Sequence, residues 1–144
     1  MQFSLQQLTQ IASSIVDDAK KRVSPDHATL ITFSGDLGAG KTTMIQEIAR
    51  QLGVTESLQS PTYVIYKIYK TNGAVWKNLI HGDMYRLEHH NEILQLGWEQ
   101  LLSDPDNIIC IEWPEKIQDV LPKWTASVVL RHDGSESRSI NILV

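Results

Sequence analysis

A chain of 144 residues with 42% hydrophobic side chains is long enough to bury a core, and we expect residues 1–144 to form one compact domain. Its net charge of −4 comes from acidic and basic residues that are mixed along the chain, so no broad basic field favours direct, tight binding of RNA or DNA. The sequence has no run of about eighteen apolar residues, and its N-terminus lacks the basic region and apolar segment of a signal peptide, so we expect a cytoplasmic protein without a membrane segment. We also expect the protein to be a monomer on its own.

The first segment has apolar residues at every third or fourth position, which predicts an amphipathic helix. Ser4 suits the N-cap of this helix, and the basic residues of 20–22 suit its C-terminal end, where they offset the helix dipole. After a break at residues 23–26, the segment 28–33 is predicted as a buried strand. The apolar face of the helix consists of Leu5, Leu8, Ile11, Ala12, Ile15, Val16 and Ala19.

A glycine-rich stretch follows this strand and leads into a predicted helix over residues 41–52, and it fits the phosphate-binding pattern G-x-x-x-x-G-K-[ST]. Glycines let backbone amides and the positive end of the helix converge on a phosphate, and Lys41 adds a charge directed at the β- and γ-phosphates. The Thr42 hydroxyl can bind Mg²⁺, whereas Thr43 fits the first helical turn. The strand and helix on either side favour a nucleotide site over a turn without a ligand. The predicted site consists of Gly35, Asp36, Leu37, Gly38, Ala39, Gly40, Lys41, Thr42 and Thr43.

Residues 62–69 are rich in β-branched and aromatic side chains, and with residues 75–81 they predict a hairpin around the turn at 71–73. Packing on a sheet explains these aromatic residues better than base stacking does. Thr62 follows Pro61 in the loop before the hairpin. It is either a switch residue that senses the γ-phosphate and its metal, or part of an ordinary turn at a proline.

The rest of the chain is predicted as helix and strand in alternation, followed by a last hairpin. The apolar run at 108–111 is typical of a strand that is buried on both faces of a parallel sheet. We therefore predict an α/β fold, a three-layer sandwich like those of P-loop nucleotide hydrolases, whose mixed sheet has a parallel core and antiparallel hairpins. The predicted segments are a helix over 87–102 interrupted near Gly97, the strand 108–111, a short helix over 114–120, and strands over 126–130 and 139–144.

Two carboxylates are candidate partners of the phosphate loop. Glu112 ends the apolar strand 108–111, where P-loop nucleotidases place a second magnesium ligand, although many strands simply end in a solvated acid. Asp83 lies in the polar stretch 81–86, where it either holds Mg²⁺ through water, orients the attacking water, or caps the next segment. Arg86, in the same stretch, suits a carboxylate or a phosphate partner.

Four motifs that occur in this order give the chain a resemblance to the bacterial TsaE family, the ATPases of tRNA threonylcarbamoyladenosine biosynthesis. The resemblance extends over essentially the whole chain. It implies a small Mg²⁺-dependent ATPase that works with the proteins TsaB and TsaD to form the N6-threonylcarbamoyl group on adenosine 37 of tRNAs reading ANN codons. It also implies that the subunit does not transfer the carbamoyl group itself and meets tRNA only through the complex. The motifs are the stretches 35–43, 60–63, 81–86 and 111–115.

The resemblance also assigns roles to residues at the motif positions. It implies that Lys41 and Thr42 bind phosphate and Mg²⁺, that Glu112 binds Mg²⁺, and that Asp83 supports hydrolysis. Trp113 would lie beside the nucleotide. Lys41, Asp83 and Glu112 are therefore the candidate catalytic residues, and Thr42 and Glu112 the candidate metal ligands.

Two departures from the family pattern fall outside these positions, namely Met44 and the stretch after Glu115. Two other functions are also compatible with the sequence motifs. One is a small P-loop kinase, although the roughly thirty residues after Glu112 leave little chain for a lid that closes over an acceptor. The other is a nucleotide-dependent binding module without significant hydrolysis. A GTPase is disfavoured, because the chain has no Asn-Lys-x-Asp segment.

Overall fold

The computed structural model describes residues 5–35, 40–59, 64–133 and 137–143, with side chains from residue 6 to residue 130 within these ranges. Asp36, Leu37, Gly38, Ala39 and Thr62 therefore lie outside the described residues, as does the expected N-cap Ser4. The elements in chain order are α1 (Leu5–Lys20), β1 (Thr29–Gly35), α2 (Lys41–Gln51), β2 (Tyr66–Lys70), β3 (Asn78–Asp83), α3 (Asn91–Leu94), α4 (Trp98–Leu102), β4 (Asn107–Glu112), the 3-10 helix η1 (Pro114–Val120), β5 (Ala126–Asp133) and β6 (Ser137–Leu143).

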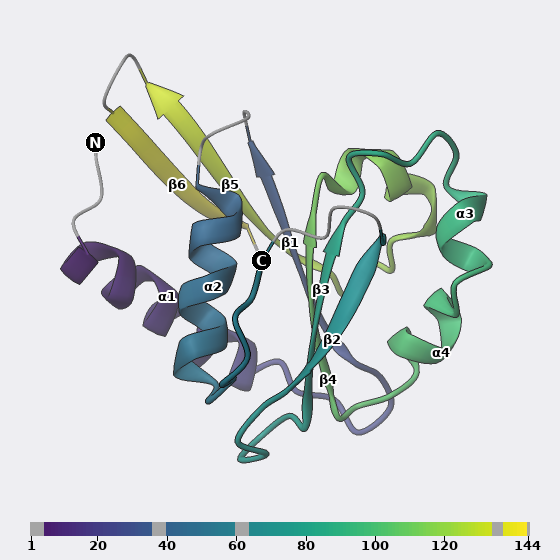
Figure 1. The fold of residues 1–144 in the computed structure, drawn as a ribbon, viewed down its shortest axis with the longest axis horizontal. Helices are drawn as coiled ribbons and strands as arrows, with labels where there is room; N and C mark the ends of the chain where they lie inside the picture. The colour runs from purple at the N-terminus through teal and green to yellow at the C-terminus, as the bar shows by residue number, and fades with distance from the viewer. Residues whose placement is uncertain (1–4, 36–39, 60–63, 134–136, 144) are drawn as a thin grey trace.

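One sheet with the strand order β2-β3-β4-β1-β5-β6 organises the fold (Figure 1). The four central strands, β3, β4, β1 and β5, run parallel to one another. The two edge strands are antiparallel, β2 to β3 and β6 to β5. The prediction of a parallel core with antiparallel hairpins is thus confirmed. Because β1 and β4 are parallel neighbours, the end of β1 at Gly35 and the end of β4 at Glu112 lie at the same edge of the sheet.

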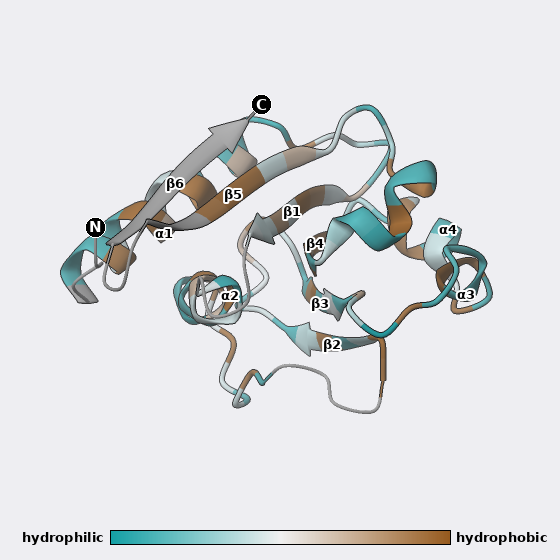
Figure 2. Ribbon diagram, turned by 90° about the horizontal axis from the view of Figure 1, so that it is seen from above, coloured by the Kyte–Doolittle hydropathy of each residue, from teal (hydrophilic) through white to brown (hydrophobic). Residues whose placement is uncertain are grey.

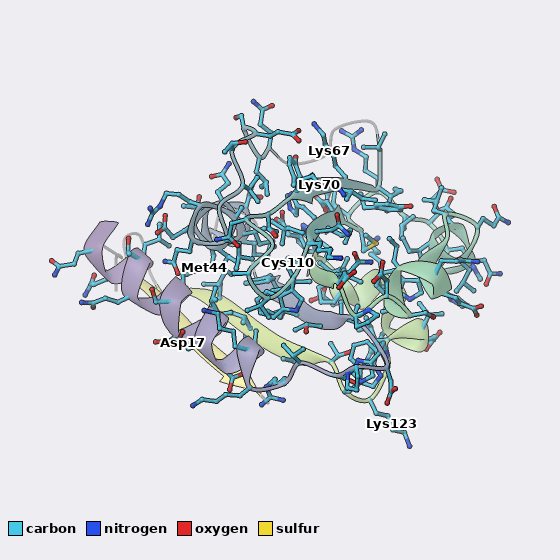
Figure 3. The ribbon with its side chains drawn as sticks, turned by 90° about the horizontal axis from the view of Figure 1, so that it is seen from below. Asp17, Met44, Lys67, Lys70, Cys110 and Lys123 are labelled. Carbon is cyan, nitrogen blue, oxygen red and sulfur yellow. The ribbon has the colours of Figure 1, made fainter. Side chains whose placement is uncertain are left out.

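Helices cover both faces of the sheet, so the molecule has three layers. Viewed from above, α1 and α2 lie on one side of the sheet, and η1, α3 and α4 on the other (Figure 2). One apolar cluster joins α1 and α2 to side chains such as Phe33 and Cys110, and a second cluster joins the other helices to side chains such as Ile80 and Ile111. Met44 and Cys110 lie inside the molecule, whereas Lys123 points outward (Figure 3). The expectation that Cys110 is a buried core residue is confirmed.

The structure corrects several predicted boundaries. The helix expected over 87–102 begins only at Asn91, whereas the predicted interruption near Gly97 is confirmed, because Gly97 has a left-handed backbone with φ of 83° and separates α3 from α4. The helix predicted at 114–120 has these bounds but is a 3-10 helix, and Ile117 within it has non-helical angles. Strand β2 begins only at Tyr66, and β5 extends to Asp133. Among the described residues, every helix falls short of the length and apolar character that spanning a bilayer requires.

A partly buried polar network connects α2 to α1. Glu47 is buried in α2, and its carboxylate accepts hydrogen bonds from Arg50 at 2.6 Å and from Gln51 at 3.2 Å. Gln51 in turn donates to the backbone oxygen of Thr9 at 3.0 Å and accepts a bond from Ser13 at 3.1 Å. The hydrogen bond from Arg50 lowers the pKa of Glu47, and its burial opposes that effect. The ionised carboxylate therefore stabilises the contact between the two helices.

The end of β1 approaches β5 more closely than a side chain allows. Gly35 pairs with Leu130 and has a φ of 140°, and a Cβ added there would lie 1.9 Å from the Leu130 carbonyl oxygen. A residue with a side chain would have to displace β5 as well as adopt a backbone conformation that suits glycine almost alone. The first glycine of the phosphate-loop motif is thus required by the packing of the sheet.

We expect Glu47→Gln to lower the free energy of unfolding at neutral pH, because the amide loses the charge that Arg50 and Gln51 stabilise. A lowered pKa stabilises the fold above the ordinary carboxyl pKa, and this contribution disappears as the pH falls through the folded-state value. The gap in the free energy of unfolding between variant and wild type should therefore stay constant from pH 7 to about pH 5 and narrow below the ordinary carboxyl pKa, in urea titrations taken down to about pH 3. The exposed Glu56→Gln is the matched control and should stay within about 0.5 kcal/mol of wild type. A gap that is constant over the whole pH range would contradict this account.

We expect Gly35→Ala to lower the free energy of unfolding by about 3 kcal/mol or more, because it combines backbone strain with a clash against β5. The control is Gly73→Ala, which has a φ of 76° but open space around the added Cβ. This variant has the backbone strain without the clash, and it should lower the free energy of unfolding by about 1 kcal/mol. Equal losses in urea titrations of the two variants would show that the approach to Leu130 is unimportant.

Candidate functional site

Several of the predicted site residues that the structure describes converge where the parallel strands end. Glu112, the last residue of β4, pairs in register with Phe33 of β1 on one side and with Asp83 of β3 on the other. Helix α2 begins with Lys41 directly after the phosphate-loop stretch. The structure thereby brings together Lys41, Thr42, Asp83 and Glu112, which are up to 71 positions apart in the chain.

Lys41 is buried at the start of α2, with 5% of its surface exposed. The preceding residue, Gly40, has a left-handed backbone with φ of 98°, which turns the chain from the loop into the helix. Lys41 Nζ donates a hydrogen bond to the Gly35 carbonyl oxygen at 2.6 Å and lies 3.8 Å from the centroid of the Trp113 ring. The ammonium group thus lies between the Gly35 carbonyl, at the start of the motif, and an aromatic face, which attracts cations.

The Glu112 carboxylate is the centre of the site and is almost fully buried, with 3% exposed. Thr42 Oγ1 lies 2.9 Å from both of its oxygens, so the threonine hydroxyl donates to the carboxylate. His81 Nε2 lies 2.6 Å from Oε2 alone. These donors explain how a carboxylate can be buried at this position, because an unpaired charge there would be very costly.

Asp83 lies beside Glu112 but nearer to the surface. Its Oδ1 accepts a hydrogen bond from the Tyr85 backbone N–H at 3.0 Å, which holds the carboxyl at the turn after β3. Burial raises the pKa of Asp83 above its ordinary value, the bond from Tyr85 opposes the rise, and the negative charge of Glu112 adds to it. Of the roles that the sequence left as alternatives, the structure shows the turn-capping contact, and it also places Asp83 beside Glu112.

Trp113 is the one non-glycine residue with a positive φ in the described ranges, at 58°. This backbone ends β4 sharply and begins η1, and it directs the indole toward Lys41. The exposed Tyr85 ring lies 5.1 Å from the Trp113 ring at an interplanar angle of 52°. A left-handed backbone is costly for a bulky residue, so the surrounding structure must hold it in place.

The donors in this cluster fit a hard divalent cation bound together with a phosphate. Thr42 and Glu112 offer hydroxyl and carboxylate oxygens, which are the ligands that Mg²⁺ takes when phosphate oxygens complete its shell. Lys41 offers a positive charge at the start of a helix of 11 residues, whose N-terminus favours anions. Thr43 lies exposed on the first turn of α2, as the sequence predicts. Arg86 is exposed in the turn after β3.

Sequence reasoning missed the contact between His81 and Glu112. The sequence pattern places His81 only as the first residue of the polar stretch 81–86. Residues 81 and 83 lie on the same side of a strand, as do residues 110 and 112, so this periodicity carried a signal. The contact also requires β3 to lie beside β4, which no local pattern in the sequence indicates.

Comparisons with known proteins show the family to which the chain belongs. The model of the family described as "Threonylcarbamoyl adenosine biosynthesis protein TsaE" matches residues 3–140. The protein named tRNA threonylcarbamoyladenosine biosynthesis protein TsaE in Bacillus subtilis is 36% identical over 111 residues, which is 77% of this chain and 66% of that protein. The protein of the same name in Rickettsia typhi is 41% identical over 93 residues, which is 64% of this chain and 61% of that protein. The chain thus spans just under two thirds of the length of these relatives.

A solved structure resembles the fold over nearly the entire chain. The crystal structure of YdiB from Bacillus subtilis superimposes with a TM-score of 0.70 and 26% sequence identity, covering 97% of this chain and 80% of that one. The family match spans all four motifs, the phosphate-loop stretch and the residues around Asp83 and Glu112 included. The chain therefore belongs to the TsaE family of threonylcarbamoyl adenosine biosynthesis proteins.

Proposed function

We propose that this protein binds Mg·ATP and hydrolyses it slowly, as a subunit required for the threonylcarbamoylation of adenosine 37 in tRNAs reading ANN codons. The observation that carries the proposal is the contact of Thr42 with Glu112 beside Lys41, at the edge where the parallel strands end. Family membership supports the tRNA-modification role. The cluster of hydroxyl, carboxylate and ammonium groups supports the nucleotide and the metal.

In the proposed mechanism each group acts according to its position. Lys41 exchanges the Gly35 carbonyl for phosphate oxygens, and Thr42 and Glu112 hold the metal from the helix and from the strand. Bound there, Mg²⁺ would neutralise the charge on the phosphates while the terminal phosphate is transferred to water. Trp113 covers Lys41 on one side and limits the access of water to its ammonium group.

Asp83 is proposed to orient and deprotonate the attacking water. It lies nearer to the surface than Glu112, on the neighbouring strand, and the Tyr85 N–H fixes one of its oxygens. A raised pKa makes the ionised carboxylate more basic, which suits a group that accepts a proton. The two carboxylates therefore have different tasks, with Glu112 holding the metal and Asp83 acting on water.

The proposed partners are the proteins TsaB and TsaD, which the family resemblance implies. A net charge of −4 without a broad basic region gives little electrostatic attraction for tRNA. We therefore propose that the protein meets tRNA only within the complex and that ATP turnover serves the partners.

We expect variants of Lys41 to differ from variants of the two carboxylates. Lys41→Ala should weaken nucleotide binding roughly 10- to 100-fold, because a charged hydrogen-bond donor to phosphate is lost. Asp83→Asn and Glu112→Gln should lower the turnover rate about 100-fold or more and weaken nucleotide binding less. Titration with a fluorescent ATP analogue and single-turnover hydrolysis measure the two effects. Lys123→Ala, which removes an outward-pointing lysine, is the control (Figure 3). Equal losses of affinity in all three site variants would contradict the assigned roles.

The function itself is tested by measuring ATP hydrolysis with and without purified TsaB and TsaD. We expect slow hydrolysis by the protein alone and faster hydrolysis in the presence of both partners. A rate that the partners do not change would reject the proposal. Transfer of phosphate to a small acceptor would instead indicate a kinase. A Glu112→Gln variant that no longer hydrolyses ATP but still supports tRNA modification would indicate a nucleotide-dependent binding module.

A further inference from the structure

His81 lies beneath the site, and the mechanism above does not use it. It belongs to β3 and is fully buried, with 0% of its surface exposed. It pairs in register with Cys110 of β4, so its ring reaches along the sheet toward Glu112, two residues further on. Leu79, two residues before His81 on the same strand, packs in the apolar cluster under α1 and α2, so the ring points to the face that α2 covers.

The ring has polar contact on one side only. Its Nε2 lies 2.6 Å from Glu112 Oε2, whereas Nδ1 is buried and has no hydrogen-bond partner among the described residues. Burying a polar nitrogen without a partner is unfavourable, and a leucine would fill a comparable space without that cost. The contact with Glu112 is therefore the interaction that accounts for an imidazole at this position.

This contact fixes the Glu112 carboxylate in a way that Thr42 does not. The single hydroxyl hydrogen of Thr42 is shared between the two carboxylate oxygens, which are both 2.9 Å away. Such a bond holds the carboxylate close but favours neither oxygen. The donor from His81 reaches Oε2 alone and at a shorter distance, so it sets the rotation of the group.

We propose that His81 is a positioning residue for the metal site. Its Nε2–H holds Oε2 of Glu112 and so presents the carboxylate, next to Thr42, in one orientation for Mg²⁺. This inference rests on the proposed binding of Mg·ATP and extends it to a residue that touches neither metal nor nucleotide. Removing a residue that hydrogen-bonds to a metal ligand typically lowers the metal affinity by about 10- to 100-fold.

The test measures the affinity for a fluorescent ATP analogue at increasing Mg²⁺ concentrations and in EDTA. The readout is the Mg²⁺ concentration that gives half of the maximal gain in affinity over EDTA. His81→Leu should raise that concentration about 10- to 100-fold and leave binding in EDTA unchanged. His81→Gln places an amide N–H near the position of Nε2 and should restore Mg²⁺ dependence to within a few-fold of wild type. His81→Asn is the matched control, because its shorter amide lies near the position of Nδ1 and should behave like His81→Leu. In a Glu112→Gln background, His81→Leu should have no further effect.

Several results would overturn the inference. The inference is wrong if His81→Leu has the same Mg²⁺ dependence as wild type. It is also wrong if His81→Leu loses nucleotide affinity equally in EDTA and in Mg²⁺, because that result indicates a role in folding alone. Thermal melts identify variants that fail to fold. If His81→Leu does not fold, the test is the comparison of His81→Gln with His81→Asn. Equal Mg²⁺ dependence of nucleotide binding in these two variants rejects the proposal. Wild-type binding that does not depend on Mg²⁺ would reject the proposed function, and this inference with it.

Discussion

The buried carboxylate of Glu112 is the group on which the arrangement of the site depends. A carboxyl side chain with 3% exposure is tolerated only where polar partners surround it, and here they come from two different elements. Thr42 contributes from the start of α2, and His81 from β3. The same contacts that make the burial of Glu112 possible therefore tie the phosphate-loop helix to two strands of the sheet.

The strand order explains why these donors meet. Strand β4 lies between β1 and β3, and all three run in parallel, so their carboxyl ends form one edge. In open α/β sheets such an edge is the usual place for a ligand. The approach of Gly35 to Leu130 on the far side of β1 keeps the beginning of the loop close to β5. The site thus depends on packing on both sides of β1 as well as on the loop itself.

Much of this arrangement could be predicted from local patterns. Glycine spacing predicts the phosphate loop, and an apolar run predicts the buried strand that ends at Glu112. The same run and the turns on either side of it predict the parallel core. The break at Gly97 in the helix expected over 87–102 was predicted correctly, whereas the start of that helix was wrong, since the first helical residue is Asn91. The contact of His81 with Glu112 could not be predicted, since it depends on which strand lies beside β4. Thr62 stays a prediction, as it lies outside the described residues.

The depth of the two carboxylates gives a physical reason for their different proposed tasks. Glu112 lies deep, with its orientation set by His81, and a group fixed in this way suits a metal that requires nearly ideal geometry. Asp83 lies nearer to solvent and is held by a single backbone N–H, and burial raises its pKa. A water molecule can reach such a group, and a proton can leave it again toward solvent. If the roles were exchanged, the metal ligand would be loosely held and the base would be closed off from water. The order of burial along the edge of the sheet, with His81 deepest, then Glu112, then Asp83, therefore matches the order in which a fixed support, a metal ligand and a base are needed.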